Sequence, residues 1–340
     1  MSARLKILRP GAGVTVQDSG RPNFRALGVA LSGALDPVLL AAANVMAGAQ
    51  EGAAGLEILL AAPELRVSEG AARIGLAGVL VGMIERPDGE RQDISSWRGV
   101  VLREGDTLTL KLGRGPAYLG FSGGLDLPKI LGSRSTFLRA GFGGLEGRAL
   151  RAGDALVCGG TDGGDVSAPP LIHEAGPIRF IPGPQDDHFS PEALQKFVQA
   201  RWRVGPDSDR MGLRLAGPRL AHTTKGSNVV SDGATPGAIQ VPGDGQPIVL
   251  RADCQTSGGY AKIGCVISAD LPRLAHLAPG DVLSFIEVDH EEAATARRGA
   301  REMFDEWRAR ISPTGLLDER KLWTENLIGG ATSGENGGFR

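Results

Sequence analysis

The stretch EGDTLTLKL, residues 104–112, gives the clearest indication of the fold class. After its Gly-Asp turn, three leucines alternate with two threonines and a lysine, so the apolar side chains fall on one face. This period predicts a strand that is buried on one side. The same turn followed by an apolar run recurs in LRAGDALV (150–157) and LAPGDVLSF (277–285).

Composition supports a mainly β protein. Glycine makes up 51 of 340 residues, about twice the usual share of roughly 7%, which favours many tight turns between short strands. The formal net charge is −2, and no basic block predicts a nucleic-acid or membrane partner. The N-terminus lacks the apolar core of a signal peptide, so we expect a cytoplasmic protein.

Cysteine and histidine spacing predicts neither disulfides nor a zinc site. The three cysteines form no CxxC pair, and the five histidines are scattered along the chain. We expect each cysteine to be a small buried residue and predict no metal site.

Only a few helices are predicted. Asp36, Pro37 and Gly48 are suited to the ends of a helix over 38–47, and Ser190-Pro191 to the start of another. A last helix is expected over about 291–310, with Phe304 and Trp307 packing inward.

An internal repeat predicts two related domains. GFSGGLDLPKI (120–130) resembles VISADLPRL (266–274), and VQDSGR (16–21) resembles GPDSDR (205–210) in the same order. The glycine-rich segment 159–170 reads as a linker. The expected organisation is a first domain over 1–160, a linker over 161–172, a second domain over 173–290, and a C-terminal helix and flexible tail over 291–340.

Motifs for common chemistry are weak. The segment GFSGG (120–124) matches a hydrolase G-x-S-x-G pattern, but glycines and Pro128 follow where that motif needs a helix. No Gly-Lys dipeptide is present, so there is no Walker A loop.

Polar residues on glycine or proline turns are the remaining candidates, because functional groups are often displayed on loops of a rigid scaffold. Each one alone has an equally simple role in stabilising its turn. The segments are QDSGR (17–21), SGALD (32–36), GSRST (132–136), GPQDD (183–187), PDSDRMG (206–212), SDG (231–233), AIQVP (238–242) and QTSGGYAKIG (255–264).

At these segments the chain resembles the allophanate hydrolase subunit 2 family, also called the KipA or biotin-dependent carboxyltransferase family. Further matching segments are ANVMAG, LEILLAAPEL, LGSRSTFLRAGFGGLEGRAL and VISADLPRLAHLAPGD, so that the similarity spans about residues 5–285. The resemblance implies two cyclophilin-like β-barrel domains in tandem, with a few short helices and a C-terminal helix. It makes a nucleophile at Ser122 still less expected, because relatives commonly carry alanine there.

The resemblance also implies a set of site residues. Catalytic roles fall to Asp186, Asp187, Arg210 and Lys262. Substrate-binding roles fall to Gln185, Asp207, Asp209, Asp232, Gln240, Gln255, Thr256, Arg21 and Arg134. We expect the cationic groups to bind phosphate or carboxylate, and the aspartates to orient an amide or move a proton.

Three functions are implied. The first is the C-type subunit of an ATP-dependent 5-oxoprolinase. It would act with a B-type partner, an allophanate hydrolase subunit 1-like protein, to activate the lactam of 5-oxoproline for hydrolysis to glutamate, with ATP and Mg²⁺ bound in the assembled complex. The second is the carboxyltransferase component of a biotin-dependent urea or amide carboxylase. The third is a KipA-like regulatory binding protein. All of them need a small polar substrate or a protein partner, and none needs nucleic acid or a membrane.

Overall fold

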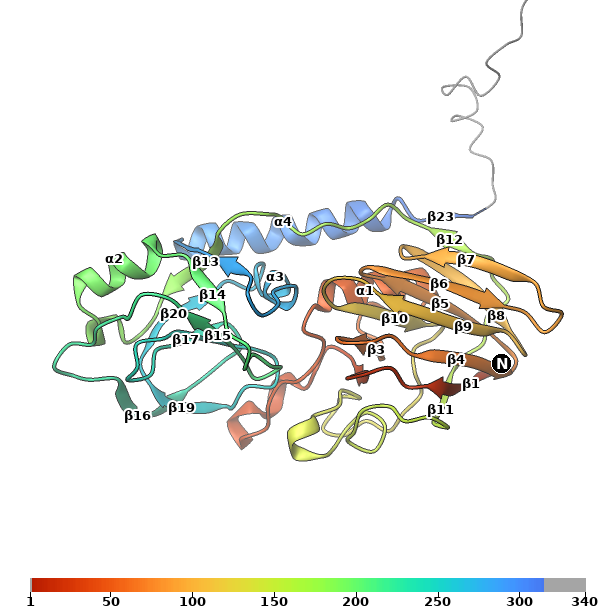
Figure 1. Cartoon of the computed structure of the whole chain (residues 1–340), viewed down its shortest axis with the longest axis horizontal. Helices are drawn as coiled ribbons and strands as arrows, with labels where there is room; N and C mark the ends of the chain where they lie inside the picture. The colour runs from red at the N-terminus through yellow and green to blue at the C-terminus, as the bar shows by residue number, and fades with distance from the viewer. Residues whose placement is uncertain (1, 315–340) are drawn as a thin grey trace, which may run out of the picture.

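The computed structural model describes residues 2–314. They form two lobes that lie side by side along the long axis, with the helix α4 (His290–Arg308) running across one side of both (Figure 1). The expected tail over 315–340 lies outside the described residues.

The first lobe consists of two antiparallel sheets packed face to face, and leucine, isoleucine and valine side chains from both fill the space between them. One sheet has the order β11 (Ala155–Gly159), β1 (Ser2–Arg9), β4 (Glu64–Glu69), β9 (Thr107–Leu112), β6 (Leu80–Glu85) and β7 (Arg91–Ser95). The other has the order β2 (Thr15–Gln17), β3 (Gly55–Ile58), β10 (Ala117–Phe121), β5 (Ala71–Ala77), β8 (Arg98–Arg103), β12 (Val166–Ser167) and β23 (Ser312–Pro313).

The strand predicted from its alternating leucines is β9. Leu108 and Leu110 are buried in the first core and Leu112 packs against it, whereas Lys111 is exposed. The apolar period therefore fixes which face of β9 meets the core.

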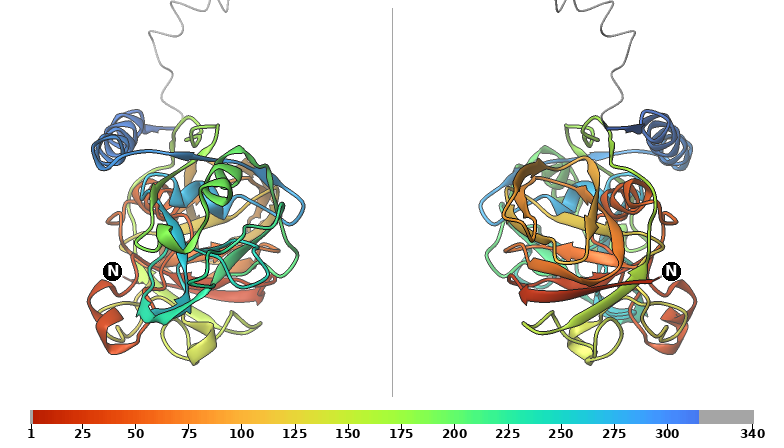
Figure 2. Two further views of the ribbon diagram at one scale, coloured as in Figure 1. Left: turned by 90° about the vertical axis from the view of Figure 1, so that its left-hand side faces the viewer. Right: turned by 90° about the vertical axis from the view of Figure 1, so that its right-hand side faces the viewer.

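The second lobe is an eight-stranded sheet that curls into a nearly closed barrel (Figure 2). Its order is β21 (Val282–Leu283), β14 (Trp202–Val204), β15 (Gly212–Ala216), β18 (Ile248–Leu250), β17 (Ala238–Gln240), β20 (Lys262–Val266), β13 (Ile178–Pro182) and β22 (Phe285–Glu287). A separate two-stranded ribbon, β16 (Asn228–Gly233) with β19 (Ser257–Tyr260), extends from it. The mainly β fold is confirmed.

Among residues 2–314, three of the four α-helices begin where the sequence predicts, and α3 (Leu271–Ala275) was not predicted. In α1 (Pro37–Ala47) the Asp36 carboxylate accepts from two backbone N–H groups, and Gly48 ends the helix with φ +80°. Ser190 caps α2 (Pro191–Gln199), and α3 is a single short turn. Three 3₁₀ segments complete the set: η1 (Pro22–Leu27), η2 (Leu138–Ala140) and η3 (Asp186–His188).

The segment between the lobes is not a free linker. Its strand β12 pairs with β8 and also with β23, which follows α4. In α4, Phe304 and Trp307 are buried against α1, as predicted, and the Trp307 indole N–H donates to the carbonyl of Pro169 at 2.8 Å. The chain therefore returns to the first lobe after completing the second.

Two smaller features bear on function. The three cysteines are free; Cys158 and Cys254 are buried, as expected, whereas Cys265 is only partly buried, and burial raises the pKa of the Cys158 thiol to about 11. Within residues 2–314, no helix combines the length and the apolar character that crossing a membrane requires.

Candidate functional site

A polar cluster at the start of β20 gathers three of the predicted residues. The Lys262 ammonium lies 2.7 Å from a carboxylate oxygen of Asp232, and the Gln185 amide donates to that same oxygen at 3.0 Å. The Gln185 side-chain carbonyl accepts from the backbone N–H of Lys262 at 3.1 Å. Lys262 is only 5% exposed, whereas the Asp232 side chain is 49% exposed. The Lys262 ammonium is thus buried, and its partner, the Asp232 carboxylate, is half exposed to solvent.

The proline turn after β13 explains how Gln185 reaches this position. A Cβ at Gly183 would lie 2.2 Å from the carbonyl oxygen of Lys262, so only glycine permits the two backbones to approach so closely. The turn therefore delivers Gln185 directly beside β20.

Gln240 extends the cluster. It lies opposite Lys262 in the β17–β20 pairing, and opposed residues in an antiparallel pair project to the same face. Its side-chain oxygen accepts from Gln255 at 3.4 Å. Gln240 is 2% exposed, yet its side-chain nitrogen has no hydrogen-bond partner among the described residues.

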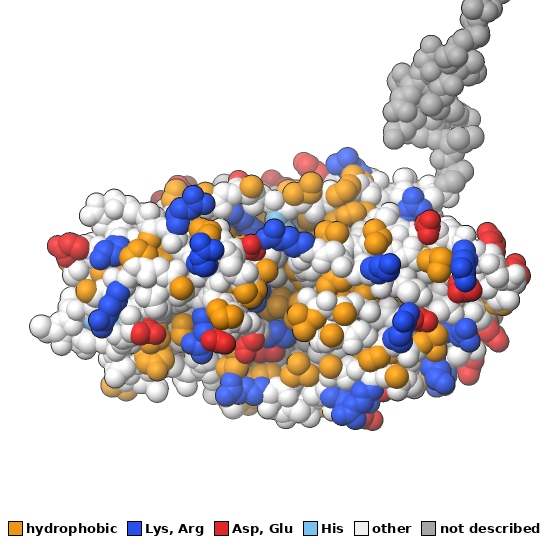
Figure 3. All heavy atoms as spheres, viewed as in Figure 1, with side chains coloured by type: hydrophobic (Ala, Val, Ile, Leu, Met, Phe, Trp, Pro, Cys, Tyr) orange, Lys and Arg blue, Asp and Glu red, His pale blue; other side chains and the backbone are white. Residues whose placement is uncertain are grey.

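A cavity of about 240 Å³ adjoins Gln240 and Gln255. It lies at the boundary between the lobes, where charged side chains of both signs gather on the surface (Figure 3). The first lobe contributes Arg139, and the second contributes the other lining residues: Asp207, Asp209, Met211, Gly212, Arg214, Gln240, Ile248, Leu250, Gln255 and Tyr260. A site with two amides and charges of both signs is suited to a small polar ligand.

Asp232 is ionised under all ordinary conditions. Hydrogen bonds from Lys262 and Gln185 lower its pKa to about 2. It therefore acts as a fixed anion that positions Lys262, and it is not a proton donor near neutral pH.

The two adjacent aspartates of η3 lie beside the cluster but outside its hydrogen bonds. Asp187 is exposed and pairs with Lys225, which lowers the pKa of Asp187. Asp186 is exposed, and its side chain makes no hydrogen bond within residues 2–314. Thr256 is half-buried, and its carbonyl accepts from the backbone of Ala234 at 2.9 Å.

Arg210 lies elsewhere, in the interface between the lobes. It is 9% exposed and makes two bonds to Asp253, at 2.8 and 3.1 Å, and an ion pair with Glu57 of the first lobe. It also donates to the carbonyl of Gly33 at 2.6 Å. Burial acts to lower the pKa of Arg210, but Glu57 and Asp253 hold it above its ordinary value. The structure thus separates Arg210 from Lys262, although its neighbours Asp209 and Met211 line the cavity.

The interface network continues into the first lobe. The Tyr118 hydroxyl donates to Glu57 at 2.8 Å and accepts from the backbone N–H of Asp36 at the same distance. Burial, together with the charge of Glu57, raises the pKa of Tyr118 well above its ordinary value. Tyr118 therefore stays a neutral donor to a buried carboxylate.

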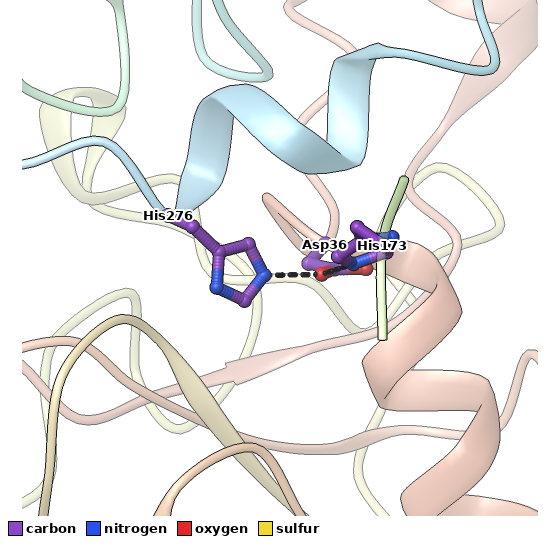
Figure 4. A group of neighbouring side chains, drawn as sticks. All are labelled: Asp36, His173 and His276. Carbon is purple, nitrogen blue, oxygen red and sulfur yellow. Dashed lines mark hydrogen bonds and ion pairs between the residues drawn. The ribbon is translucent and has the colours of Figure 1, made fainter. Parts of the chain in front are cut away.

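Two histidines, far apart in the sequence, meet on Asp36 (Figure 4). Ring nitrogens of His173 and His276 lie 2.6 and 2.8 Å from the same carboxylate oxygen of Asp36. Burial acts to raise the pKa of Asp36, but the hydrogen bonds from both histidines hold it below its ordinary value. The spacing of the histidines in the sequence did not predict this meeting, because it depends on how the fold brings together the start of α1, the residue just after the linker and the residue after α3.

Within residues 2–314, these three side chains form the one group that could hold a metal ion, since their ligand atoms lie within 4.8 Å of one another. In the structure, the hydrogen bonds already satisfy the carboxylate oxygen that faces the histidines. We therefore describe the group as a polar joint between the lobes.

This joint predicts a pH dependence of stability. Because the folded-state pKa of Asp36 is depressed, its contribution is complete above its unfolded pKa of about 3.9 and is lost as the pH falls through the folded value. Asp36→Asn keeps a cap acceptor but removes the charge, and should lower the free energy of unfolding at neutral pH by about 1–3 kcal/mol. The difference in the free energy of unfolding between wild type and Asp36→Asn, measured by urea unfolding, should become smaller as the pH is lowered from about 5 to about 2. Asp162→Asn, at an exposed aspartate, is the control, and a difference for Asp36→Asn that is constant with pH would contradict the account.

Arg21 and Arg134 lie in the first lobe and make structural contacts. Arg21 is 1% exposed, donates to the carbonyl of Ser135 at 2.6 Å and stacks over Phe142, and burial lowers its pKa. Arg134 donates to the carbonyl of Leu127 at 2.6 Å and lines a separate polar cavity of about 560 Å³. The structure does not bring either residue to the Lys262 cluster.

Four residues with polar roles at the interface were not predicted from the sequence: Glu57, Asp253, Tyr118 and Arg139. Glu57 had a recognisable signal, since it is a lone charge within an otherwise apolar strand. Asp253 stands two residues before Gln255, next to a segment already selected. Arg139 offered no such signal, because only the packing of the two lobes brings η2 to the cavity.

The comparisons with known proteins agree on one family. Residues 27–287 match the family of the carboxyltransferase domain, subdomain A and B. The chain is 39% identical over 313 residues to the C-type 5-oxoprolinase subunit of Escherichia coli, covering 89% of this chain and 98% of that protein. It is 30% identical to the urea amidolyase of Saccharomyces cerevisiae, but covers only 17% of that protein. The crystal structure of Kluyveromyces lactis urea carboxylase superposes with a TM-score of 0.80 at 27% identity, over 91% of this chain and 30% of that one.

Proposed function

Because the chain belongs to the family of the carboxyltransferase domain, subdomain A and B, we propose that it is the C-type subunit of an ATP-dependent 5-oxoprolinase. The observation that carries this proposal is its 39% identity to the Escherichia coli protein over 98% of that protein's length. The two urea-processing relatives, in contrast, are several times longer than this chain, which spans 17% and 30% of their lengths.

The site supports the proposal chemically. A lactam acid presents an amide and a carboxylate, and the cavity offers glutamine amides together with arginines. Lys262 does not line this cavity but lies opposite Gln240 in the sheet, and its proposed role is to stabilise the negative charge that develops on the lactam oxygen. Asp232 and Gln185 hold Lys262 in place.

ATP supplies a phosphoryl group that converts the lactam oxygen into a leaving group, since the unactivated carbonyl is a poor electrophile. The cavity of about 240 Å³ does not fit a nucleotide, since drug-sized ligands usually occupy about 300–1,000 Å³. We therefore assign to this cavity the binding and orientation of the small substrate. The nucleotide is proposed to bind in the assembled complex with a partner protein, of the kind implied by the name of the Escherichia coli relative as one subunit among several.

The direct test is an ATPase assay on the chain copurified with the partner encoded beside it. We expect ATP consumption only when 5-oxoproline is present. A properly assembled complex that ignores 5-oxoproline would reject the proposal.

A carboxyltransferase acting on urea is the second candidate, favoured by the TM-score of 0.80 to the Kluyveromyces lactis urea carboxylase. It would need a biotin carrier on another chain, because this sequence contains no Met-Lys pair of the kind that carries biotin. Replacing 5-oxoproline with urea in the same assay separates the two candidates.

A pair of adjacent glycines allows a controlled test of the site. A Cβ at Gly258 would lie 2.3 Å from the Gln240 side-chain nitrogen, whereas a Cβ at Gly259 would meet nothing closer than 3.6 Å. Gly258→Ala should displace Gln240 and raise KM by about tenfold, the effect of losing one hydrogen bond. Gly259→Ala is the matched control and should behave as wild type. Equal kinetics for the two variants would remove Gln240 from the site.

A further inference from the structure

Arg139 is the one contribution of the first lobe to the cavity at the lobe boundary. It lies on η2 and is exposed, and within residues 2–314 it forms no ion pair. Among the described residues, the one hydrogen bond of its guanidinium goes to the sulfur of Met211, which is a weak acceptor. A guanidinium without an anion, at the edge of a cavity, is able to bind a carboxylate in a forked geometry.

A second lining residue, Gln240, provides an unsatisfied donor. Gln240 is 2% exposed, and its side-chain nitrogen lacks a partner among the described residues, which is costly for a buried amide. Its oxygen is already bonded to Gln255. The group that Gln240 needs is therefore an acceptor, such as the carbonyl oxygen of a bound amide.

The other charges around the cavity do not cancel this arrangement. The Asp209 carboxylate accepts from the backbone N–H groups of Met211 and Gly212, at 2.7 and 3.2 Å. Asp207 is exposed, so that solvent screens its charge, and Arg214 is a second arginine that lines the same cavity. Arg139 thus remains available to an incoming anion.

From these contacts we propose that Arg139 determines substrate specificity across the lobe boundary, binding the carboxylate of a small amide whose carbonyl oxygen accepts from Gln240. The identification of that ligand as a lactam acid rests on the proposed function. The inference adds a requirement: the ligand carries both a carboxylate and an amide, so urea and uncharged lactams are discriminated against by the first lobe. The two lobes form one site, and neither is sufficient alone.

The experiment measures binding and turnover by the complex of the chain with its partner protein. The probes are 5-oxoproline, 2-pyrrolidinone, which is the same lactam without the carboxylate, and urea. Arg139→Gln should raise the Kd and KM for 5-oxoproline by about 10- to 100-fold, the range expected for a hydrogen bond to a charged group. The kcat should change by less than about threefold, because the carboxylate is not itself a reacting group.

Arg151→Gln is the matched control, since Arg151 is an exposed arginine of the same lobe that does not line this cavity. Wild type should bind 5-oxoproline more tightly than 2-pyrrolidinone. In Arg139→Gln the Kd values of the two ligands should become similar. Unchanged melting temperatures of both variants will show that folding is intact.

The outcomes separate this inference from the proposed function. If the complex consumes ATP with 5-oxoproline and Arg139→Gln has no effect on KM, the role of Arg139 is overturned while the proposed function stands. If 5-oxoproline binds in an Arg139-dependent manner but ATP is not consumed, the proposed function fails and the role of Arg139 stands. Tight binding of 2-pyrrolidinone, or no binding of 5-oxoproline at all, overturns the inference.

Discussion

Arg210→Met should destabilise the protein by about 3–5 kcal/mol, because removing one partner leaves a buried charge uncompensated. Here the loss would affect two carboxylates at once, Asp253 at 4% exposure and Glu57 at 0%. Methionine keeps most of the side-chain volume, so the effect reports the lost charge and not a cavity. Because Arg210 connects the lobes, we also expect their docking to weaken.

Urea unfolding followed by circular dichroism measures this effect. Arg4→Met is the control, since Arg4 pairs with Glu69 on the surface with half of its side chain exposed, and such pairs contribute about 0–1 kcal/mol. A similar small loss for both variants would show that the Glu57–Arg210–Asp253 network does not hold the lobes together.

Lys262→Met should have the largest effect on turnover. The kcat/KM of the assembled enzyme should fall by about 10²–10³-fold, the effect of removing one preorganised electrostatic group. Stability should change little, because Asp232 is half exposed and is hydrated when its partner is removed. The variant therefore separates catalysis from folding, which Arg210→Met does not.

Steady-state ATPase kinetics with 5-oxoproline check this prediction, with Lys196→Met as the control at an exposed lysine on α2. Lys262→Arg should restore part of the rate if charge is what matters. Wild-type kinetics in Lys262→Met would remove the residue from the mechanism, although the fold would be unaffected.

Much of the fold was predictable from the sequence, because strands and helix ends are determined by interactions between residues close together in the chain. Alternating leucines in β9 have only one arrangement that buries them, and Asp36 and Ser190 cap helices through contacts within one turn. The internal repeat located the ends of β10 and β20. It did not predict that the second Asp-Leu-Pro opens α3 while the first leads into a loop, where Leu131 and Gly132 take positive φ values of 54° and 80°.

The candidate site was predictable only in part. Gln185, Asp232, Gln240, Gln255 and Lys262 come together because they share neighbouring strands and turns of one lobe. The contacts of Arg210, and the meeting of His173 and His276 on Asp36, depend on how two lobes pack. No local pattern carries that information, since Gly33, Asp36 and Glu57 belong to the first lobe and lie 137 to 240 positions from their partners.

The doubled connection between the lobes affects how the molecule responds to force and to ligands. The chain leaves the first lobe after β12 and returns to it at β23, and these two strands are hydrogen-bonded to each other in the first lobe's sheet. A hinge motion needs a single flexible connection, whereas here two connections join the lobes and restrict their relative movement. We therefore expect calorimetry to record one melting transition for both halves, and the ligand to enter through local side-chain movement rather than by the halves swinging apart.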